Sequence, residues 1–411
     1  MKLAVFTNRF PGKISTFFAR DLRALIEAGA EPEVFPIYPG DQRLWRFVPS
    51  ILADVLPRDR VHHLASLGGL RASAALPGPA MRLLARETPR FAVTAARYGA
   101  APLAKTLFVL PIAAAWAARH AHRFDHVLAY WGNYAGTCAY LAHRLAGRDI
   151  PFSIYLHAGT DLFRTQVLLD EKLRYADRIV TECEFNRRFI ADLYPDLFPS
   201  IAPRIQVNLM GLDLAEFPYR PEGRAPHRVL GVGWLAEAKG YHVLLRALGH
   251  LAREGVPFEL ELVGDGEEAG RLRALARSLG IVDRVRFRGW LHFDDVRRAM
   301  LEATLFVHPS TRLGDAKPNV IQEAMALGTP VVASAVAGIP ELLDQGRCGV
   351  LVPPRDDAAL AAAIRGLLQD PARRLALAAA GRRHVERRLD LWRNGRRLMD
   401  HLASARRGTC L

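Results

Sequence analysis

Short apolar segments alternate with segments of helical period along nearly the whole chain. Six segments in the first half have the length and apolar content of strands: 2–7, 33–38, 126–131, 152–157, 178–183 and 204–209. Six more follow in the second half, at 228–233, 258–264, 284–289, 305–310, 330–334 and 349–353. Strands that alternate with helices in this way are typical of parallel sheets covered by helices. The pattern therefore predicts an α/β fold with two doubly wound, Rossmann-like domains.

A segment without helical period separates the two halves. Residues 211–227 contain three prolines and two glycines, and we expect a linker there. The N-terminal domain is then predicted at 1–210 and the C-terminal domain at 228–385. The stretch 382–407 has the pattern of one basic helix, and we expect the end of the chain, 386–411, to pack back on the first domain. With 411 residues, 50% of them hydrophobic, the chain is long enough for two cores.

The cysteines lie far apart and include no C-x-x-C pair: Cys138, Cys183, Cys348 and Cys410. This spacing indicates neither a zinc site nor a disulfide framework, and it is typical of a reducing cytoplasm. No signal peptide is predicted, because only Leu3 to Phe6 are apolar before polar residues follow. No group of His, Asp and Glu has metal-ligand spacing, so we expect no metal site. These features predict a cytoplasmic protein without a metal cofactor.

Positive charge is concentrated between Gln42 and Arg123. Twelve Lys or Arg against three acids give this stretch a net charge of +9, out of +14 for the chain. Aromatic residues are interspersed with the charges: Trp45, Phe47, Phe91, Tyr98 and Trp116. Such a face suits nucleic acid or anionic lipid, and the alternative is a set of solvated, arginine-rich helix faces. The longest apolar run lies here too: thirteen residues from Thr106 to Ala118, too short to span a bilayer and suited to a buried or interfacial helix.

The stretch 308–334 carries the most specific chemistry. It has the pattern of a buried strand, a polar loop, a helix and a second apolar strand. Pro318 suits the first position of that helix, and the N–H groups of Asn319 and Val320 can then face an anion. In doubly wound sheets, ligands bind where strands end in this way. The stretch predicts a phosphate-competent helix end.

Two carboxylates bracket this helix end. Asp315 lies in the loop, and Glu323 lies about a turn and a half inside the helix. Carboxylates in these positions suit a ligand that offers sugar hydroxyls as well as phosphate. The alternative for Glu323 is a helix-start carboxylate that only interacts with the helix dipole.

Other strand ends add candidate residues. Lys239 precedes the helix that begins at Tyr241, so its ammonium group and the helix end can converge on a diphosphate; the alternative is an exposed surface lysine. Gly12, in the loop after the first strand, lacks a side chain and can approach a phosphate. Gly264 and the backbone from Arg288 to Trp290 follow strands and are candidate walls for a base, or simple turns.

His157 ends a predicted strand and is followed by AGTD. A lone histidine at a strand end is more often structural than catalytic. Asp161 is expected to cap the next helix.

Several motifs follow one another in an order typical of one family: GVGWLAEAKGYHVLLRAL, LVGDGEEAGRLRALARSLGIVDRVRFRGWL, the Asp315 to Glu323 stretch and AGIPELLDQGRCGVLVPPRDDAALAAAI. The second half thereby resembles the retaining, GT-B-type glycosyltransferases of family four. The first half is similar to the exopolysaccharide branch of that family, the colanic-acid and amylovoran glycosyltransferases, through FPGKISTFFARDLRALIEAG, YWGNYAGTCAYLAHRLAGRDIPFSIYLHAGTDLF, ADRIVTECEFNRRFI and VNLMGLDLAEF. The resemblance implies a GT-B fold, in which two Rossmann-like domains face each other across a cleft.

The resemblance also implies roles for the candidate residues. Lys239 holds the donor's pyrophosphate, Glu323 binds the nucleotide ribose, and His157 faces the donor sugar and the acceptor. Asp315 stands where the family usually has a glutamate that contacts the donor sugar, and it is one methylene shorter. Trp234 stands where the family commonly has an arginine that helps with the phosphates. We expect Arg312 or Lys317 to supply that charge, or phosphate binding to be weaker.

The predicted activity is retaining transfer of a sugar from a nucleotide-diphosphate sugar to a glycan or a polyprenyl-diphosphate-linked glycan. The resemblance places this work in exopolysaccharide synthesis at the inner face of the cytoplasmic membrane, with anionic lipid rather than nucleic acid as the partner of the basic face. Two alternatives stay open. A dinucleotide-dependent enzyme is suggested by GVGWLA, which fits G-x-G-x-x-A. A degenerate, noncatalytic binding subunit is suggested by Trp234 and Asp315.

Overall fold

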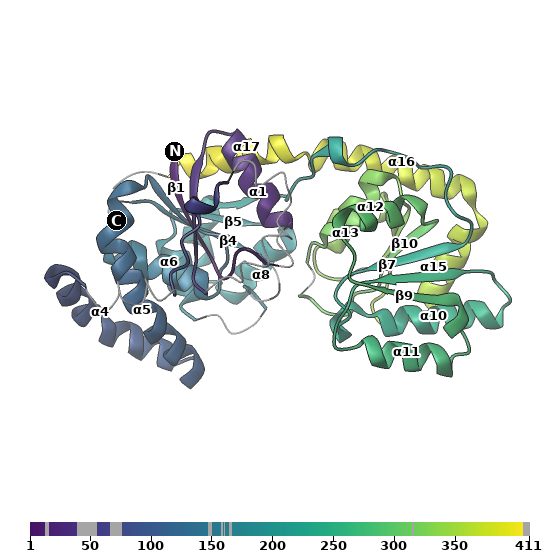
Figure 1. The fold of residues 1–411 in the computed structure, drawn as a ribbon, viewed down its shortest axis with the longest axis horizontal. Helices are drawn as coiled ribbons and strands as arrows, with labels where there is room; N and C mark the ends of the chain where they lie inside the picture. Colours follow the sequence, from purple (N-terminus) through teal and green to yellow (C-terminus); the bar gives the residue numbers. More distant parts are fainter. Residues whose placement is uncertain are drawn as a thin grey trace. The chain divides into compact units, whose positions relative to one another are not determined.

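A computed structural model of the chain describes residues 1–12, 16–38, 56–65, 76–146, 150–157, 159, 161–163, 167–314 and 316–405. The chain forms two compact units, Met1–Gly211 with Leu391–Leu411, and Leu212–Asp390. Among the described residues, each unit has its own parallel sheet of six strands, with helices around it (Figure 1). The α/β, doubly wound prediction is confirmed. All twelve predicted strands are present, and their bounds differ from the predicted ones by at most two residues.

The sheet of the first unit has the order β2-β1-β3-β4-β5-β6. The strands are β1 (Lys2–Thr7), β2 (Glu31–Pro36), β3 (His126–Ala129), β4 (Phe152–Leu156), β5 (Arg178–Thr181) and β6 (Ile205–Val207). The α-helices of its described part are α1 (Thr16–Glu27), α4 (Gly78–Ala96), α5 (Ala100–His120), α6 (Tyr134–Leu145), α7 (Leu169–Tyr175), α8 (Glu184–Leu193), α9 (Phe198–Ile201) and α17 (Leu391–Ala403). Phe6 packs in one core with α5, and its neighbour Val5 packs in another with α1. Both faces of the sheet are therefore covered.

The sheet of the second unit has the order β12-β11-β10-β7-β8-β9. The strands are β7 (Arg228–Val232), β8 (Glu259–Val263), β9 (Val285–Gly289), β10 (Leu305–His308), β11 (Val331–Ser334) and β12 (Val350–Val352). The α-helices of its described part are α10 (Tyr241–Arg253), α11 (Ala269–Ser278), α12 (Phe293–Glu302), α13 (Asn319–Leu327), α14 (Ile339–Leu342), α15 (Asp357–Gln369) and α16 (Pro371–Arg388). Successive strands run outward in opposite directions from the β7/β10 pair. That pair is the topological switch point, where doubly wound sheets bind ligands.

The segment 211–227 packs against the second unit over most of its length. Phe217 is 1% exposed and contacts Phe293 at the start of α12. The Arg224 guanidinium donates to the main-chain oxygens of Met300 and Ala303. Burial of this arginine lowers its pKa to about 10, so it stays charged at neutral pH.

The basic stretch at 382–407 forms two helices, and the prediction of one helix is wrong. The chain leaves the helical conformation at Leu389, and Asp390 forms a β-bridge with Leu212 before α17 begins. Helix α17 then lies beside α1 in the first unit (Figure 1). Its Gly395 meets Ala24 of α1, where a Cβ atom would lie 2.4 Å from the alanine Cβ.

Two of the aromatic residues expected on the face between Gln42 and Arg123 are buried instead, while Tyr98 is partly buried. Phe91 is 0% and Trp116 1% exposed, and both belong to the first core. Trp45 and Phe47 lie outside the described residues. Aromatic rings of this size contribute most when they are buried, so the core holds them.

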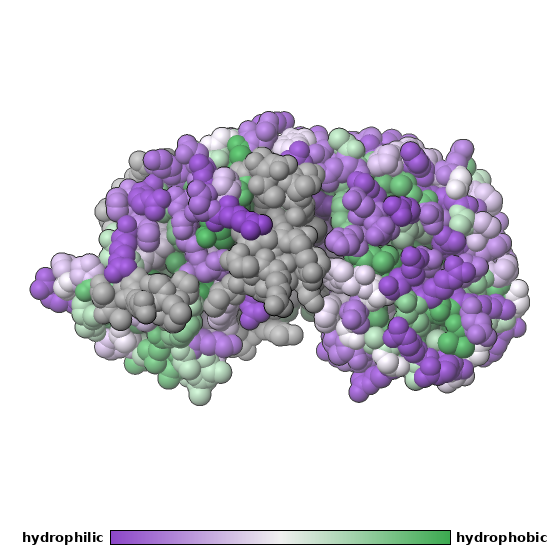
Figure 2. All heavy atoms as spheres, in the orientation of Figure 1, coloured by the Kyte–Doolittle hydropathy of each residue, from purple (hydrophilic) through white to green (hydrophobic). Residues whose placement is uncertain are grey.

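The apolar run from Thr106 is part of a longer helix than predicted. By length and composition the segment Ala100–Arg123 could cross a membrane, yet 50% of its most apolar window is buried inside the first unit. Helix α5 thus fits the expectation of a buried core helix. Apolar side chains do remain on the surface of α4 and α5: Met81, Val93, Leu107 and Phe108. Figure 2 shows apolar surface near the junction of these helices, next to strongly hydrophilic surface.

Candidate active site

The loops that follow β7 and β10 touch at the switch point of the second sheet. Lys239 ends a short 3₁₀ turn after β7, and it is half-buried. The next residue, Gly240, has φ of +71°, and a Cβ atom there would lie 1.9 Å from the carbonyl oxygen of Pro309. Thr311 donates its N–H to the carbonyl oxygen of Ala238 at 2.9 Å. Only glycine permits this approach, which holds the lysine loop against the chain that leads to α13.

The start of α13 differs from the prediction by one residue. Pro318 is the N-cap, with ψ of 119°, and Asn319 is the first helical residue. An extended residue directly before the helix is the usual N-cap conformation. The side chain of Pro318 makes no capping hydrogen bond, so the first N–H groups at Asn319 and Val320 point out of the helix end.

Two cations were expected to compensate for Trp234, and they lie in different surroundings. Lys317 is 6% exposed, and its ammonium group donates to Gln322 Oε1 at 3.0 Å. Arg312 is exposed and pairs with Glu237 at 2.8 Å. Lys317 is therefore built into the entry of α13, whereas Arg312 ties the two loops together from the surface.

The carboxylate of Glu323 lies deeper than expected. A carboxylate that binds the hydroxyls of a ligand was expected at this helix end, but Glu323 is only 5% exposed. It occupies the second turn of α13, whose residues from Ile321 to Leu327 are all buried. The other predicted carboxylate, Asp315, lies outside the described residues.

Three glycines meet at the ends of β7, β8 and β9. Gly264 donates its N–H to the carbonyl oxygen of Gly289 at 2.8 Å. At Gly264, φ is +131°, and a Cβ atom would lie 1.9 Å from the carbonyl oxygen of Gly233. The Arg288 guanidinium extends toward Glu261, 3.3 Å away, so it is the bare backbone that can form the predicted wall. Trp234 is 46% exposed beside this edge, and its indole N–H donates to Glu267 at 2.8 Å.

In the first unit, His157 directly follows β4 and is 4% exposed. Rings surround the imidazole, with centroid distances of 4.4 to 5.8 Å: Phe17, Tyr130, Trp131 and Tyr155. Its Nδ1 atom lies 3.6 Å from Glu182 Oε2, and its buried Nε2 atom has no hydrogen-bond partner among the described residues. Gly12, the other candidate of this unit, follows β1 and is half-buried.

Asp161 does not cap a helix, and that prediction is wrong. Its carboxylate accepts hydrogen bonds from the N–H groups of Gly132 at 2.8 Å and His157 at 3.1 Å. It thereby joins the loops that follow β3 and β4. The ammonium group of buried Lys172 donates to the Gly132 carbonyl at 2.7 Å, on the other side of the same residue. Burial raises the pKa of Asp161 to about 6 and lowers that of Lys172 to about 7.

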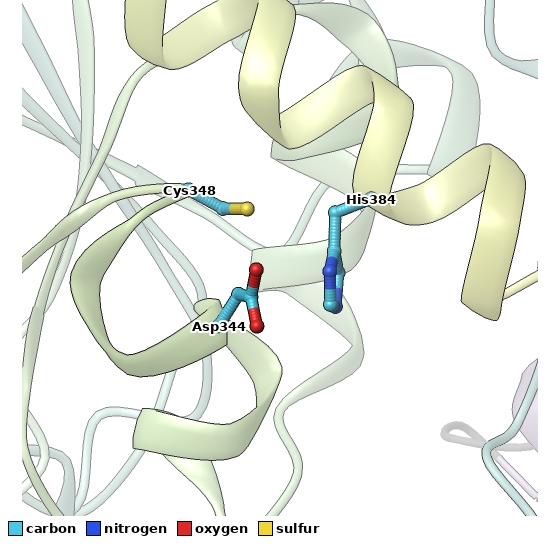
Figure 3. A group of neighbouring side chains, drawn as sticks. All are labelled: Asp344, Cys348 and His384. Carbon is cyan, nitrogen blue, oxygen red and sulfur yellow. The ribbon is translucent and has the colours of Figure 1, made fainter.

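Asp344, Cys348 and His384 come together away from these loops. Their ligand-type atoms lie within 4.8 Å of one another, and Figure 3 shows the three side chains converging. Cys348 precedes β12 and so lies at the amino edge of the sheet. Asp344 is already paired with Arg347, whose Nε lies 2.8 Å away, and further arginines at 383, 387 and 388 surround the group. This positive environment disfavours a divalent cation.

Two doubly wound parallel sheets, with polar and glycine-rich loops at the carboxyl ends of their strands, define a nucleotide-binding α/β enzyme of the GT-B fold. The family model for "Glycosyl transferases group 1" matches residues 226–370. The amylovoran biosynthesis glycosyltransferase AmsK of Erwinia amylovora is 30% identical over 406 residues, which cover 94% of this chain and 95% of AmsK. The chain belongs to the group 1 glycosyltransferases, and it is therefore an enzyme of sugar transfer rather than a dinucleotide-dependent one.

Further similarities agree with this assignment. A protein of Escherichia coli K12 that carries the name of a colanic acid biosynthesis glycosyltransferase, WcaL, is 29% identical over 381 residues, 88% of this chain and 89% of its own. The crystal structure of Anabaena HepE in complex with UDP matches with a TM-score of 0.70 at 19% identity, over 98% of this chain and 99% of HepE. At that identity, the HepE match shows the fold.

Two buried charged residues of these sites were not predicted from the sequence. Glu182 was part of a motif but had no role, and Lys172 had no signal at all. Strand ends mark loops, and they do not reveal which buried side chains pair across neighbouring strands. A signal for Glu182 did exist, since a carboxylate directly after a strand is unusual unless it has a partner.

Proposed function

We propose that this enzyme transfers a sugar, with retention of the anomeric configuration, from a nucleotide-diphosphate sugar to a glycan or lipid-linked glycan of exopolysaccharide synthesis. The observation that carries the proposal is the contact between the loops after β7 and β10. It brings Lys239 next to the chain entering α13, at the switch point where a diphosphate finds both a cation and helix N–H groups. The amylovoran and colanic acid relatives support the biosynthetic context.

The donor is assigned to the second unit. Lys239 and the N–H groups of Asn319 and Val320 hold the diphosphate, Glu323 binds the ribose, and Asp315 contacts the sugar. The glycine edge at Gly264 and Gly289 leaves room for a planar base against the backbone. HepE has been solved with UDP and with UDP-glucose, which makes uridine nucleotides the first donors to screen.

Chemically, the enzyme must stabilise the negative charge that develops on the departing diphosphate. Preorganised donors at a helix end and an ammonium group supply this stabilisation, without reorganisation during the reaction. Residues of the chain therefore carry the charge, and we propose that the reaction needs no metal ion. The acceptor is assigned to the first unit, where His157 directly follows β4.

We further propose that the enzyme works in the cytoplasm, at the inner face of the membrane. The surface of α4 and α5 supports this placement, since Leu107 and Phe108 are 40% and 42% exposed on the same helix as Lys105. Arg82, Arg86 and Arg90 are exposed on α4. A basic surface with a few apolar side chains suits anionic lipid headgroups.

The test is a thermal unfolding screen with nucleotide-sugars, followed by a turnover assay with the one that stabilises the protein. A ligand at 100 times its Kd stabilises the folded state by about 2.7 kcal/mol. One nucleotide-sugar is expected to raise the unfolding temperature and to be consumed, with the anomeric configuration of the product determined by NMR. Turnover with inversion would overturn the retaining mechanism, and the absence of any turnover with the stabilising ligand would overturn the proposed activity.

A further inference from the structure

The two ring nitrogens of His157 lie in different surroundings. Nδ1 faces Glu182, while Nε2 is buried and has no hydrogen-bond partner in the part of the chain that the structure describes. The hydroxyl groups of the flanking tyrosines bond elsewhere: Tyr130 donates to Asp21 at 2.6 Å, and Tyr155 donates to the carbonyl oxygen of Asn208 at 3.1 Å. An unpartnered buried nitrogen is costly, and such atoms occur where a polar ligand is to bind.

Partly exposed rings mark the side from which a ligand can approach. Tyr130 and Tyr155 are fully buried, whereas Phe17 and Trp131 are only partly buried. Phe17 and Trp131 are therefore the two rings of this cluster that lie nearest to solvent.

Glu182 lies where it can set the orientation and the charge of the His157 ring. It directly follows β5, the neighbour of β4 in the parallel sheet, so both side chains leave the same sheet edge. Glu182 and His157 are each 4% exposed, and the Nδ1–Oε2 distance is 3.6 Å. Catalytic hydrogen bonds are often this long before a substrate binds, and they tighten in the complex.

The charges around His157 favour the imidazolium. Burial lowers the pKa of His157, but Glu182, Asp161 and Asp21 outweigh burial and raise it above its usual value. Glu182 directly follows β5, Asp161 lies in the loop after His157, and Asp21 lies in α1. Glu182 makes the largest of the raising contributions, so the charge on His157 depends mainly on this residue.

We propose that Glu182 is a positioning residue of the transfer reaction. It keeps Nδ1 protonated and the ring oriented, so that the imidazolium presents Nε2–H to an oxygen of the substrate. The inference rests on the proposed function, in which His157 contacts the substrate. Asp161 has a separate task in the same site, because it accepts the N–H of His157 and fixes the backbone rather than the ring.

The test compares Glu182→Gln with Glu184→Gln. Glu184 lies two residues along the chain, begins α8 and pairs with Arg187 at 3.6 Å on the surface, so it is a matched control. In substrate-free protein, NMR titration of the His157 ring is expected to give a lower pKa in Glu182→Gln and an unchanged pKa in Glu184→Gln. An unchanged pKa in both variants would overturn the proposal, and this readout needs no turnover.

Kinetics separate positioning from a merely structural role. Glu182→Gln should lower kcat on the order of 100-fold, as a misplaced catalytic group does. Its rate should also fall with rising pH at a lower pH than in the wild type, because His157 loses its proton earlier. In a His157→Ala background, adding Glu182→Gln should cost almost nothing further. An equal loss in both backgrounds would overturn the positioning role, while absence of wild-type turnover would count against the proposed function alone.

Discussion

Because position 234 holds a tryptophan, the positive charge near the expected diphosphate has to come from another residue, and Lys239 is the candidate. With no arginine at that position, Lys239 is the cation that the loop after β7 brings to the switch point. Gly240 permits the tight approach of this loop to Pro309, which limits where the ammonium group can go. The lysine should therefore act on the departing diphosphate as well as on donor binding.

We predict that Lys239→Ala lowers kcat by about 10²- to 10³-fold, the usual loss when one stabilising donor is removed. The donor KM should rise in the same variant, which steady-state kinetics with varied donor will show. Arg246→Ala is the control, since Arg246 is exposed further along α10. A loss confined to acceptor affinity would contradict the assignment of Lys239 to the diphosphate.

Glu323→Gln should weaken donor binding by about 10- to 100-fold, since a charged hydrogen-bond acceptor contributes about 1.5–3 kcal/mol. Calorimetry with the stabilising nucleotide-sugar measures this loss. Because Glu323 is 5% exposed, the same variant needs a thermal unfolding measurement to show that the fold persists. Glu302→Gln, on the exposed end of α12, is the matched control. Unchanged affinity and turnover would remove Glu323 from the site.

At the scale of elements, periodicity and turn residues are enough to predict each strand that the structure describes in the two sheets. Buried parallel strands are short, continuous apolar runs, so their ends are well marked. Helix ends were harder. The break between α16 and α17 depends on the bridge from Asp390 to Leu212, and no local signal announces a contact between residues so far apart in the chain. For the same reason, neither the burial of Phe91 nor the pairing of Glu182 with His157 was predicted.

The basic surface of α4 and α5 is predicted to bind anionic membranes. The protein should sediment with anionic vesicles, be largely released by high salt, and bind neutral vesicles poorly. Each basic residue near an anionic surface contributes about 1 kcal/mol, and salt screens this attraction. Equal binding to neutral vesicles would point to apolar insertion, and no binding to either would leave the arginines as a solvated surface.

Leu107→Ser combined with Phe108→Ser tests the apolar part of that surface. Both side chains are exposed, so the fold should tolerate the change while vesicle binding weakens. Leu375→Ser, at a position 40% exposed on α16 of the other unit, is the control and should bind vesicles like the wild type.

At the scale of the whole molecule, the enzyme is predicted to be independent of divalent ions. Transfer activity should survive exhaustive chelation, since we propose that Lys239 and helix N–H groups stabilise the phosphate charge. The group of Asp344, Cys348 and His384 lies near the amino ends of the strands, opposite the ends that carry the expected donor site. Cys348→Ala should therefore leave activity unchanged. An absolute requirement for magnesium or manganese would contradict this scheme of phosphate binding.

The chain passes between its two units twice, after Gly211 and again after Asp390. The second unit is one continuous segment, whereas the first unit also contains α17. This helix is synthesised only after the whole second unit. Until then, Ala24 and the apolar face of α1 lack the helix that covers them. The unit that we assign to the acceptor is therefore completed last, once α17 has been made and packs against α1. A chain that ended before Leu391 would contain all residues of the second unit but would lack the helix whose Gly395 packs against Ala24, so α1 of the first unit would stay uncovered.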